Sequence, residues 1–348
     1  MPKLSALRAF SSLPRRQKTS VVILAVIALT FLIQFVLSYV RMPVYDEAGV
    51  FSEGIVGHVK TLNPLFVDFS DADRDLSELI FSGLVRWDPV KQNFFPDLAE
   101  NVDKSSNGLV YTLKMRTGAL WHDNQPVTVD DAYFTFKDVI QNPAFRNPVL
   151  KNAFEGVKIE KLANENTIKF TLKSPNSYFV SYLTAGLVPK HLLNDASIAS
   201  LELSSFGKQP IGSGPYKLTS LKLNSDGDQV DLALFDAYYG EKPVIKSFRF
   251  FTFPTEKEML REKGALHALS KLSKDGALAI SGDQRFINYP YTLNQFTALY
   301  SNSDSAFLAD KGVRQAVNFA INKDDLLLNG EHRVDTPDIA AHKDSPEF

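Results

Sequence analysis

The sequence predicts a mixed α/β protein of the α+β kind, in which strands and helices alternate without a regular repeat. Four segments alternate apolar and polar residues, as strands with one buried face do; they are 110–116, 167–173, 229–235 and 244–253. Two further segments, beginning at Thr128 and near residue 306, have helical features. Because no strand–helix repeat is present, we expect a mixed fold and not a barrel.

The first predicted element is an apolar helix at 20–40, where 21 consecutive residues carry no charge. At 1.5 Å per residue this segment spans roughly 30 Å, the thickness of the hydrocarbon core of a bilayer. Residues 1–19 contain only basic charged residues, so the positive-inside rule places them in the cytoplasm and the chain after Arg41 outside. The five basic residues are Lys3, Arg8, Arg15, Arg16 and Lys18.

A cleaved signal peptide is the alternative to a membrane anchor at 20–40. The apolar run is longer than a typical signal-peptide core, and no small-residue cleavage site follows it in SYVRMPVYDE. We therefore predict an uncleaved signal anchor at 20–40 and a linker at 41–50. The predicted location is the cell membrane, crossed once, with the remaining domain on the extracytoplasmic side, periplasmic or extracellular.

The predicted elements of the exported part have local start signals. Asn107-Gly108 precedes the strand at 110–116, and Asp226-Gly227 precedes the strand at 229–235; both pairs are turn signals. Thr128 and Asp131 form a capping-box pattern that begins a helix. In the last predicted helix, apolar residues fall on one face at helical spacing; they are Val313, Ala316, Val317, Ala320 and Ile321.

The composition is that of a chain with a substantial core: 44% of residues are hydrophobic and 26 are phenylalanine. The formal net charge of −2 argues against a nucleic-acid binder, which would carry a basic excess. The absence of cysteine excludes disulfides, thiolate metal sites and cysteine nucleophiles.

No motif predicts an enzyme. The segment IGSGPYKL at 211–218 lacks the lysine–hydroxyl pair of a phosphate-binding loop, and Pro215 removes a backbone donor. His122 next to Asp123 suggests a metal or acid–base site, but no two histidines are spaced as metal ligands on one helix. No G-x-S-x-G elbow is present. We predict no catalytic residue, no metal site and no cofactor.

Seven stretches together resemble the peptide-type (family 5) extracellular solute-binding proteins of ABC transporters, with the dipeptide- and oligopeptide-binding branch closest. In chain order they are LNPLF at 62–66, ELIFSGLVRWD at 78–88, a long stretch at 95–136 containing LWHDNQPVTVDDAY, LVPKHLL at 187–193, PIGSGPYKL at 210–218, FDAYYGEKPVIKSFRF at 235–250 and GVRQAVNFAINKDDLL at 312–327. The resemblance extends from about residue 51 to residue 328.

The resemblance implies a periplasmic-binding-protein-like fold with two lobes that close on a ligand. GALHAL at 264–269 is similar to the family's crossing into the second lobe, so we expect a first lobe at 51–268 and a second lobe from 269. Family members continue much further than residue 348. We therefore expect the second lobe at 269–348 to be partial and the chain to be C-terminally incomplete, either as a fragment of a longer protein or as a shortened member of the family.

The resemblance also implies site residues. Ser52, Glu53 and Gly54 lie where the family has a ligand-facing loop, and we expect them to contact the ligand from that loop. Gly212, Ser213, Gly214 and Pro215 match the family's G-T-G-P segment, with Ser213 at the threonine position. We expect this segment to have an architectural role, as a turn near the hinge. Trp121 is expected in the core.

The function implied is that of a membrane-anchored binding component of an ABC importer, which captures di- or oligopeptides between the lobes and delivers them to a permease. The implied partners are a peptide, the permease subunits and, through the N-terminal helix, the membrane; no nucleic acid is expected. One alternative is a surface sensor or scaffold module without transport. Another is a binder of a different ligand, such as a nickel chelate or a sugar, because fold alone does not set function.

Overall fold

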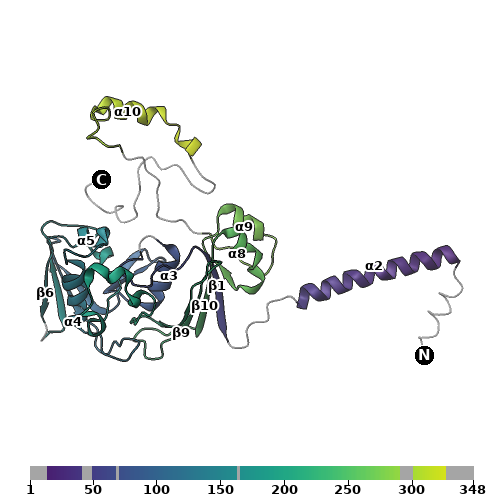
Figure 1. The fold of residues 1–348 in the computed structure, drawn as a ribbon, viewed down its shortest axis with the longest axis horizontal. Helices are drawn as coiled ribbons and strands as arrows, with labels where there is room; N and C mark the ends of the chain where they lie inside the picture. Colours follow the sequence, from purple (N-terminus) through teal and green to yellow (C-terminus); the bar gives the residue numbers. More distant parts are fainter. Residues whose placement is uncertain (1–13, 41–48, 68–69, 163–164, 291–300, 327–348) are drawn as a thin grey trace.

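The computed structural model describes residues 14–40, 49–67, 70–162, 165–290 and 301–326. These residues form a mixed α/β protein, as the sequence predicts, with two main sheets and short helices around them (Figure 1). Most of the predicted linker at 41–50 lies outside the described residues, and Val50 already begins the first strand.

The first sheet has five strands in the order β11-β1-β10-β9-β8. Their bounds are β1 Val50–Val56, β8 Tyr216–Lys222, β9 Gln229–Leu234, β10 Ser247–Phe253 and β11 Ala268–Leu269. Strand β1 pairs in parallel with both β10 and β11, whereas β10, β9 and β8 are antiparallel neighbours. The sheet therefore brings together an early segment of the chain and two segments about 200 residues later.

The second sheet is a four-stranded antiparallel sheet in the order β4-β5-β7-β6. Its strands are β4 Ala99–Lys104, β5 Val110–Met115, β6 Lys158–Leu162 and β7 Thr167–Thr171. A separate hairpin is formed by β2 Val85–Asp88 and β3 Asn93–Pro96. The four predicted strands are confirmed as β5, β7, β9 and β10, although β10 begins only at Ser247.

The helices are short apart from the first. They are α2 Arg15–Val40, α3 Asp71–Ile80, α4 Val129–Tyr133, α5 Pro148–Ala153, α6 Phe179–Tyr182, α7 Lys190–Leu193, α8 Glu256–Arg261, α9 Lys274–Ile280 and α10 Lys311–Ala320. A π-helical segment, η1 Phe134–Ile140, continues α4, and short 3₁₀ turns are η3 Ile198–Leu203, η4 Ser205–Gly207, η5 Lys263–Ala265 and η6 Lys323–Leu326. In Figure 1, α8 lies beside β1 and β10, and α9 packs against α8.

Both predicted helices of the exported part are confirmed. Thr128 and Asp131 form the full capping box of α4, with Thr128 N donating to Asp131 Oδ2 at 2.9 Å. Helix α10 covers the predicted periodic segment, but none of its residues is buried.

Helix α2 covers the apolar segment at 20–40. Across the parts of the chain that the structure describes, no helix combines the length and apolar character required to cross a membrane. The anchor therefore stays a prediction.

The core is aromatic, as the phenylalanine content predicts. One cluster lies between the four-stranded sheet and the helices that cover it, with ring centroids 5.0–6.0 Å apart and mostly tilted or edge-to-face geometry. Its members are Tyr111, Phe136, Phe154, Phe170 and Phe179. Trp121 is fully buried, so its predicted core position is confirmed.

Candidate functional site

Ser52, Glu53 and Gly54 lie in the middle of β1, between β10 and β11, and not in a loop. The expectation that they lie in a loop is therefore wrong. Hydrophobic and aromatic residues flank the trio in VFSEGIV and favour an extended, half-buried strand. Because successive side chains of a strand point to opposite faces, Ser52 and Gly54 share one face of the sheet and Glu53 points to the other.

Ser52 is held by the segment that leads into β11. Its amide donates to Nδ1 of His267 at 3.0 Å, and its hydroxyl donates to the carbonyl oxygen of Ala265 at 3.1 Å. The amide of His267 in turn donates to the Ser52 carbonyl at 2.9 Å. Ser52 is only 7% exposed, and its amide, carbonyl and hydroxyl groups all form hydrogen bonds with residues 265–267.

Gly54 makes room for side chains that pack on the same face. A Cβ at this position would lie 2.7 Å from Cδ1 of Leu266 and 3.2 Å from Cγ of Met259, in α8. These distances are shorter than ordinary van der Waals contacts, so the side chains of Leu266 and Met259 occupy the space next to β1 that a side chain at residue 54 would fill.

Glu53 faces α3 and a group of charged side chains. The Ser270 hydroxyl donates to Oε1 of Glu53, and Nζ of Lys271 lies 2.7 Å from a carboxylate oxygen of Asp75. Burial raises the pKa of Glu53; the hydrogen bond from Ser270 lowers it, nearby Asp75 raises it and Lys271 lowers it, with burial the largest effect. Burial likewise raises the pKa of Glu78. The arrangement favours a proton or an added positive charge close to Glu53.

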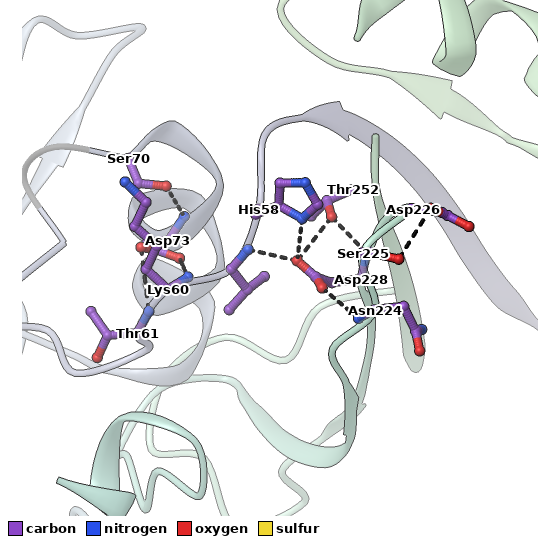
Figure 2. A network of polar contacts seen from close by, with 11 residues as sticks. His58, Lys60, Thr61, Ser70, Asp73, Asn224, Ser225, Asp226, Asp228 and Thr252 are labelled. Atoms are coloured by element: carbon purple, nitrogen blue, oxygen red, sulfur yellow. Dashed lines mark hydrogen bonds and ion pairs between the residues drawn. The ribbon is translucent and has the colours of Figure 1, made fainter. Parts of the chain in front are cut away.

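Two buried carboxylates fix the chain where it leaves β1 (Figure 2). Asp228, just before β9, accepts hydrogen bonds from the amide of Val59 at 2.8 Å, the amide of Asn224 at 3.0 Å and the hydroxyl of Thr252 at 3.1 Å. Nδ1 of His58 lies 3.3 Å from the same carboxylate. The end of β1, the β8–β9 turn and β10 are thereby joined through one side chain.

The second carboxylate, Asp73 of α3, accepts the next two amides of the chain. The amide of Lys60 donates at 2.9 Å and that of Thr61 at 3.4 Å, while the Asp73 amide donates to Ser70, the N-cap of α3 (Figure 2). Burial raises the pKa of Asp73, and the hydrogen bonds from Lys60 and Thr61 offset part of that effect. Together Asp228 and Asp73 set the position of β1 relative to α3.

The glycines of the segment at 212–215 lie against the end of α3. A Cβ on Gly212 would lie 1.9 Å from the carbonyl oxygen of Ile80, and a Cβ on Gly214 would lie 2.7 Å from the carbonyl carbon of the same residue. The Gly214 amide donates to the Ile80 carbonyl at 2.8 Å. Ser213 is buried between the glycines, and the Pro215 carbonyl accepts the amide of Phe235 at 2.8 Å.

His122 belongs to this same segment in space, which the sequence did not reveal. Its Nδ1 accepts the amide of Gly212 at 3.2 Å, and its Nε2 lies 3.1 Å from the carbonyl oxygen of Gly214. These partners require the neutral imidazole with its proton on Nε2. Burial lowers the pKa of His122 to about 4, against a smaller opposing effect of the bond to Gly214. His122 therefore stabilises the turn at 212–215 through its two ring nitrogens. No group of three metal-ligating side chains occurs in the described residues.

The model of the bacterial extracellular solute-binding proteins, family 5 (middle part), matches residues 93–342. The oligopeptide-binding protein AppA of Bacillus subtilis is 27% identical over 316 residues, which cover 83% of this chain and 53% of that protein. The chain spans about half the length of the curated relatives it matches.

Two solved structures are similar in fold. NikZ from Campylobacter jejuni in complex with Ni(L-His) matches with a TM-score of 0.65 and 29% identity over 80% of this chain and 54% of that one. AppA from Bacillus subtilis in complex with a nonapeptide matches with a TM-score of 0.60 and 26% identity over 67% of this chain and 46% of that one. The mixed α/β arrangement described above is therefore periplasmic-binding-protein-like.

Proposed function

This chain belongs to the bacterial extracellular solute-binding proteins of family 5, and from that membership we propose that it is the extracytoplasmic binding component of an ABC importer for di- or oligopeptides. It is a binding protein and not an enzyme. The observation that carries the proposal is the combined match to the family model and to an oligopeptide-binding relative over 83% of the chain.

The proposed mechanism is capture of a peptide between two lobes, formed by 51–268 and by the chain from 269 onward. An extended peptide offers backbone donors and acceptors to strands, so affinity does not depend on a particular side-chain sequence. Closure follows because the ligand binds the closed arrangement more tightly than the open one. A permease then receives the ligand.

Within the trio of β1, we propose that Glu53 contacts the ligand and that Ser52 and Gly54 position it. Ser52 and Gly54 are engaged by Ala265, Leu266 and His267, whereas Glu53 is a carboxyl group on the other face of the strand. Its raised pKa and the acidic neighbours on α3 support recognition of a positively charged ligand group. The segment at 212–215 is architectural, and the close approach of Gly212 to Ile80 supports that role.

We further propose that the helix at 20–40 anchors the protein in the cell membrane, with the solute-binding domain outside. The uncharged stretch of 21 residues and the basic residues before it support this topology.

Thermal unfolding of the full chain with a library of di- to pentapeptides tests the function. A peptide present at about 100 times its Kd stabilises the native state by about 2.7 kcal/mol and raises the Tm measurably. A folded protein whose Tm no peptide shifts would exclude peptide binding.

A metal–amino acid chelate is the second candidate ligand, favoured by the similarity to NikZ, which was solved with Ni(L-His). Thermal unfolding with nickel plus L-histidine in place of the peptides distinguishes a chelate-binding protein from a peptide-binding protein. A shift with the chelate, but not with nickel alone, L-histidine alone or any peptide, would assign the chain to chelate uptake.

A further inference from the structure

The five-stranded sheet has one end, here called the proximal end, at which β1 begins with Val50. Val50 pairs with Ser247, the first residue of β10, and Ser247 pairs in turn with Ala233 near the end of β9. Figure 1 shows β1, β10 and β9 side by side. The loop at 235–246, which joins β9 to β10, therefore lies at the proximal end.

This loop is fixed to the sheet and projects one apolar side chain. The Tyr216 hydroxyl, from the first residue of β8, donates to the carbonyl oxygen of Ile245 at 2.7 Å. Val244, directly before Ile245, is 96% exposed. Exposed lysines stand on both sides of it in the sequence; they are Lys242 and Lys246. The loop thus presents an aliphatic side chain between two cations.

The turn of the β2–β3 hairpin presents a second valine in the same way. Oδ1 of Asp88 accepts the amides of Val90 and Lys91, each at 3.0 Å, which fixes the turn. Val90 is 90% exposed, and Nζ of Lys91 lies 4.8 Å from the ring centroid of Phe95. Val90 and Val244 are the two most exposed large hydrophobic side chains among the residues that the structure describes.

The hairpin and the loop are joined through a buried carboxylate. Asp97, which directly follows β3 and is 8% exposed, accepts the Tyr239 hydroxyl at 2.5 Å. Nε of Arg116 donates to the Asp97 carbonyl oxygen at 2.9 Å, and its guanidinium lies 5.3 Å from the ring centroid of Tyr239. The base of the hairpin is therefore held against the loop at 235–246, and both belong to the proximal end.

The distribution of charge favours turning this end towards an anionic surface. The formal net charge of the chain is −2, and residues 1–40 contribute five basic and no acidic side chains, so residues 41–348 carry −7. The hairpin at 85–96 instead has a formal charge of +1, and the loop at 235–246 is neutral. An anionic surface therefore repels most of residues 41–348 more strongly than it repels the proximal end.

The predicted membrane anchor would hold the proximal end close to such a surface. The segment 41–49 joins the helix at 20–40 to Val50, and even a fully extended chain of this length spans only about 30 Å. A short tether keeps the local concentration of the two loops at the bilayer in the millimolar range. Contacts too weak to retain an untethered protein are then sufficient.

We propose that the proximal end is a membrane-contact surface, at which Val90 and Val244 enter the interfacial region of an anionic lipid bilayer and the adjacent lysines contact lipid phosphates. Exposed apolar side chains next to cations are the combination that such an interface binds. The proposal rests on the membrane anchor of the proposed function. It goes beyond that anchor by fixing which end of the sheet faces the lipid.

Single cysteines test this surface, because the chain has no cysteine of its own. Val90→Cys, Val244→Cys and Leu203→Cys are each labelled with an environment-sensitive NBD fluorophore, and the full chain is reconstituted into phosphatidylcholine vesicles with or without phosphatidylglycerol. Leu203 is the matched control: it is 89% exposed and lies near Gly207, whose carbonyl accepts the amide of Leu62 beyond the other end of β1. We expect the labels at 90 and 244, but not the label at 203, to brighten in phosphatidylglycerol vesicles and to be quenched by spin-labelled lipids.

Removal of one lysine measures the electrostatic part of the contact. Lys242→Gln in the Val244→Cys chain should lower the ratio of lipid-bound to unbound label about fivefold, the effect of one basic side chain near an anionic leaflet. Lys208→Gln, which replaces an exposed lysine beside Gly207, should leave the ratio unchanged. Thermal unfolding midpoints equal to that of the wild type establish that each labelled chain is folded.

Flotation of the vesicles reports on the anchor separately. If the chain floats but the labels at 90 and 244 respond no more than the label at 203, the contact surface is refuted and the anchor stands. If the chain does not float, the anchor is refuted and the surface with it. A response that grows with the number of chains per vesicle, and not with phosphatidylglycerol content, would assign the loops to contacts between copies of the chain and overturn the proposal. Peptide binding, measured by thermal unfolding, is independent of these results.

Discussion

The imidazole of His122 bridges the two glycines of the turn at 212–215, with Nδ1 accepting the Gly212 amide at 3.2 Å and Nε2 bonded to the Gly214 carbonyl at 3.1 Å. The amide of His122 also donates to the Gly212 carbonyl at 2.8 Å. A buried neutral histidine with both ring nitrogens hydrogen-bonded to the backbone makes the stability of the folded protein depend on pH.

The stability contributed by His122 should be lost in acid. Its folded-state pKa of about 4 lies below the ordinary value of 6.5, so this stability is fully present above pH 6.5 and falls as the pH decreases towards 4. The total is about 3 kcal/mol, at 1.36 kcal/mol per pKa unit. Urea unfolding at pH 7.5, 5.5 and 4.5 measures the decline. His122→Gln should be less stable at pH 7.5 and show a shallower decline with falling pH than the wild type.

Gly212→Ala should be strongly destabilising. The new methyl group would lie 1.9 Å from the Ile80 carbonyl oxygen, which is backbone and yields only if α3 moves. We expect a loss of about 3 kcal/mol or more in the free energy of unfolding. Gly282→Ala, where nothing lies within 4 Å of the new Cβ, is the control and should change stability by less than about 0.5 kcal/mol. Equal losses of stability in Gly212→Ala and Gly282→Ala would contradict the close packing of Gly212 against the Ile80 carbonyl.

Asp228→Ala should uncouple the end of β1 from the β8–β9 turn. The amides of Val59 and Asn224 lose their acceptor (Figure 2), and a buried donor left unpaired costs about 1–3 kcal/mol. We expect a loss of about 2–4 kcal/mol in chemical denaturation. Asp226→Ala, which removes an exposed carboxylate bonded to Ser225, should leave stability nearly unchanged.

Glu53→Gln should increase stability at neutral pH and weaken ligand binding. A carboxyl group whose pKa is raised in the folded state destabilises that state as the pH rises through the folded pKa. The neutral amide removes this penalty while still accepting a hydrogen bond from Ser270. Thermal unfolding at pH 5 and pH 8 should show a smaller difference than in the wild type. If Glu53→Gln is more stable but binds the ligand as tightly as the wild type, Glu53 does not contact the ligand.

Removal of residues 1–44 should release the protein from the membrane fraction. The full chain should stay with membranes after alkaline carbonate washing, because about 30 Å of uncharged helix matches the bilayer core. Recovery of the full chain in the soluble fraction would refute the proposed anchor.

The candidate site was only partly predictable from the sequence. The sequence located Ser52, Glu53 and Gly54 as residues of interest through family resemblance, but assigned them to a loop. VFSEGIV does not alternate apolar and polar residues, and the strand is defined by its partners β10 and β11, which lie far along the chain. His267, 215 residues from Ser52, had no signal in the sequence that would mark it as a partner.

The sequence by itself determined the elements whose cause is local. The alternation at 110–116 and 167–173, the capping box of Thr128 and Asp131, and the turn at Asp226-Gly227 depend on residues a few positions apart, so their patterns are visible along the chain. Tertiary structure alone decided that His122 meets Gly212 across 90 residues, that Asp228 and Asp73 hold the end of β1, and that Ala265 and His267 bond to Ser52. Those contacts arise because packing of two sheets and α3 brings distant backbone groups together and buries them, and buried polar groups must then find partners in space and not in sequence.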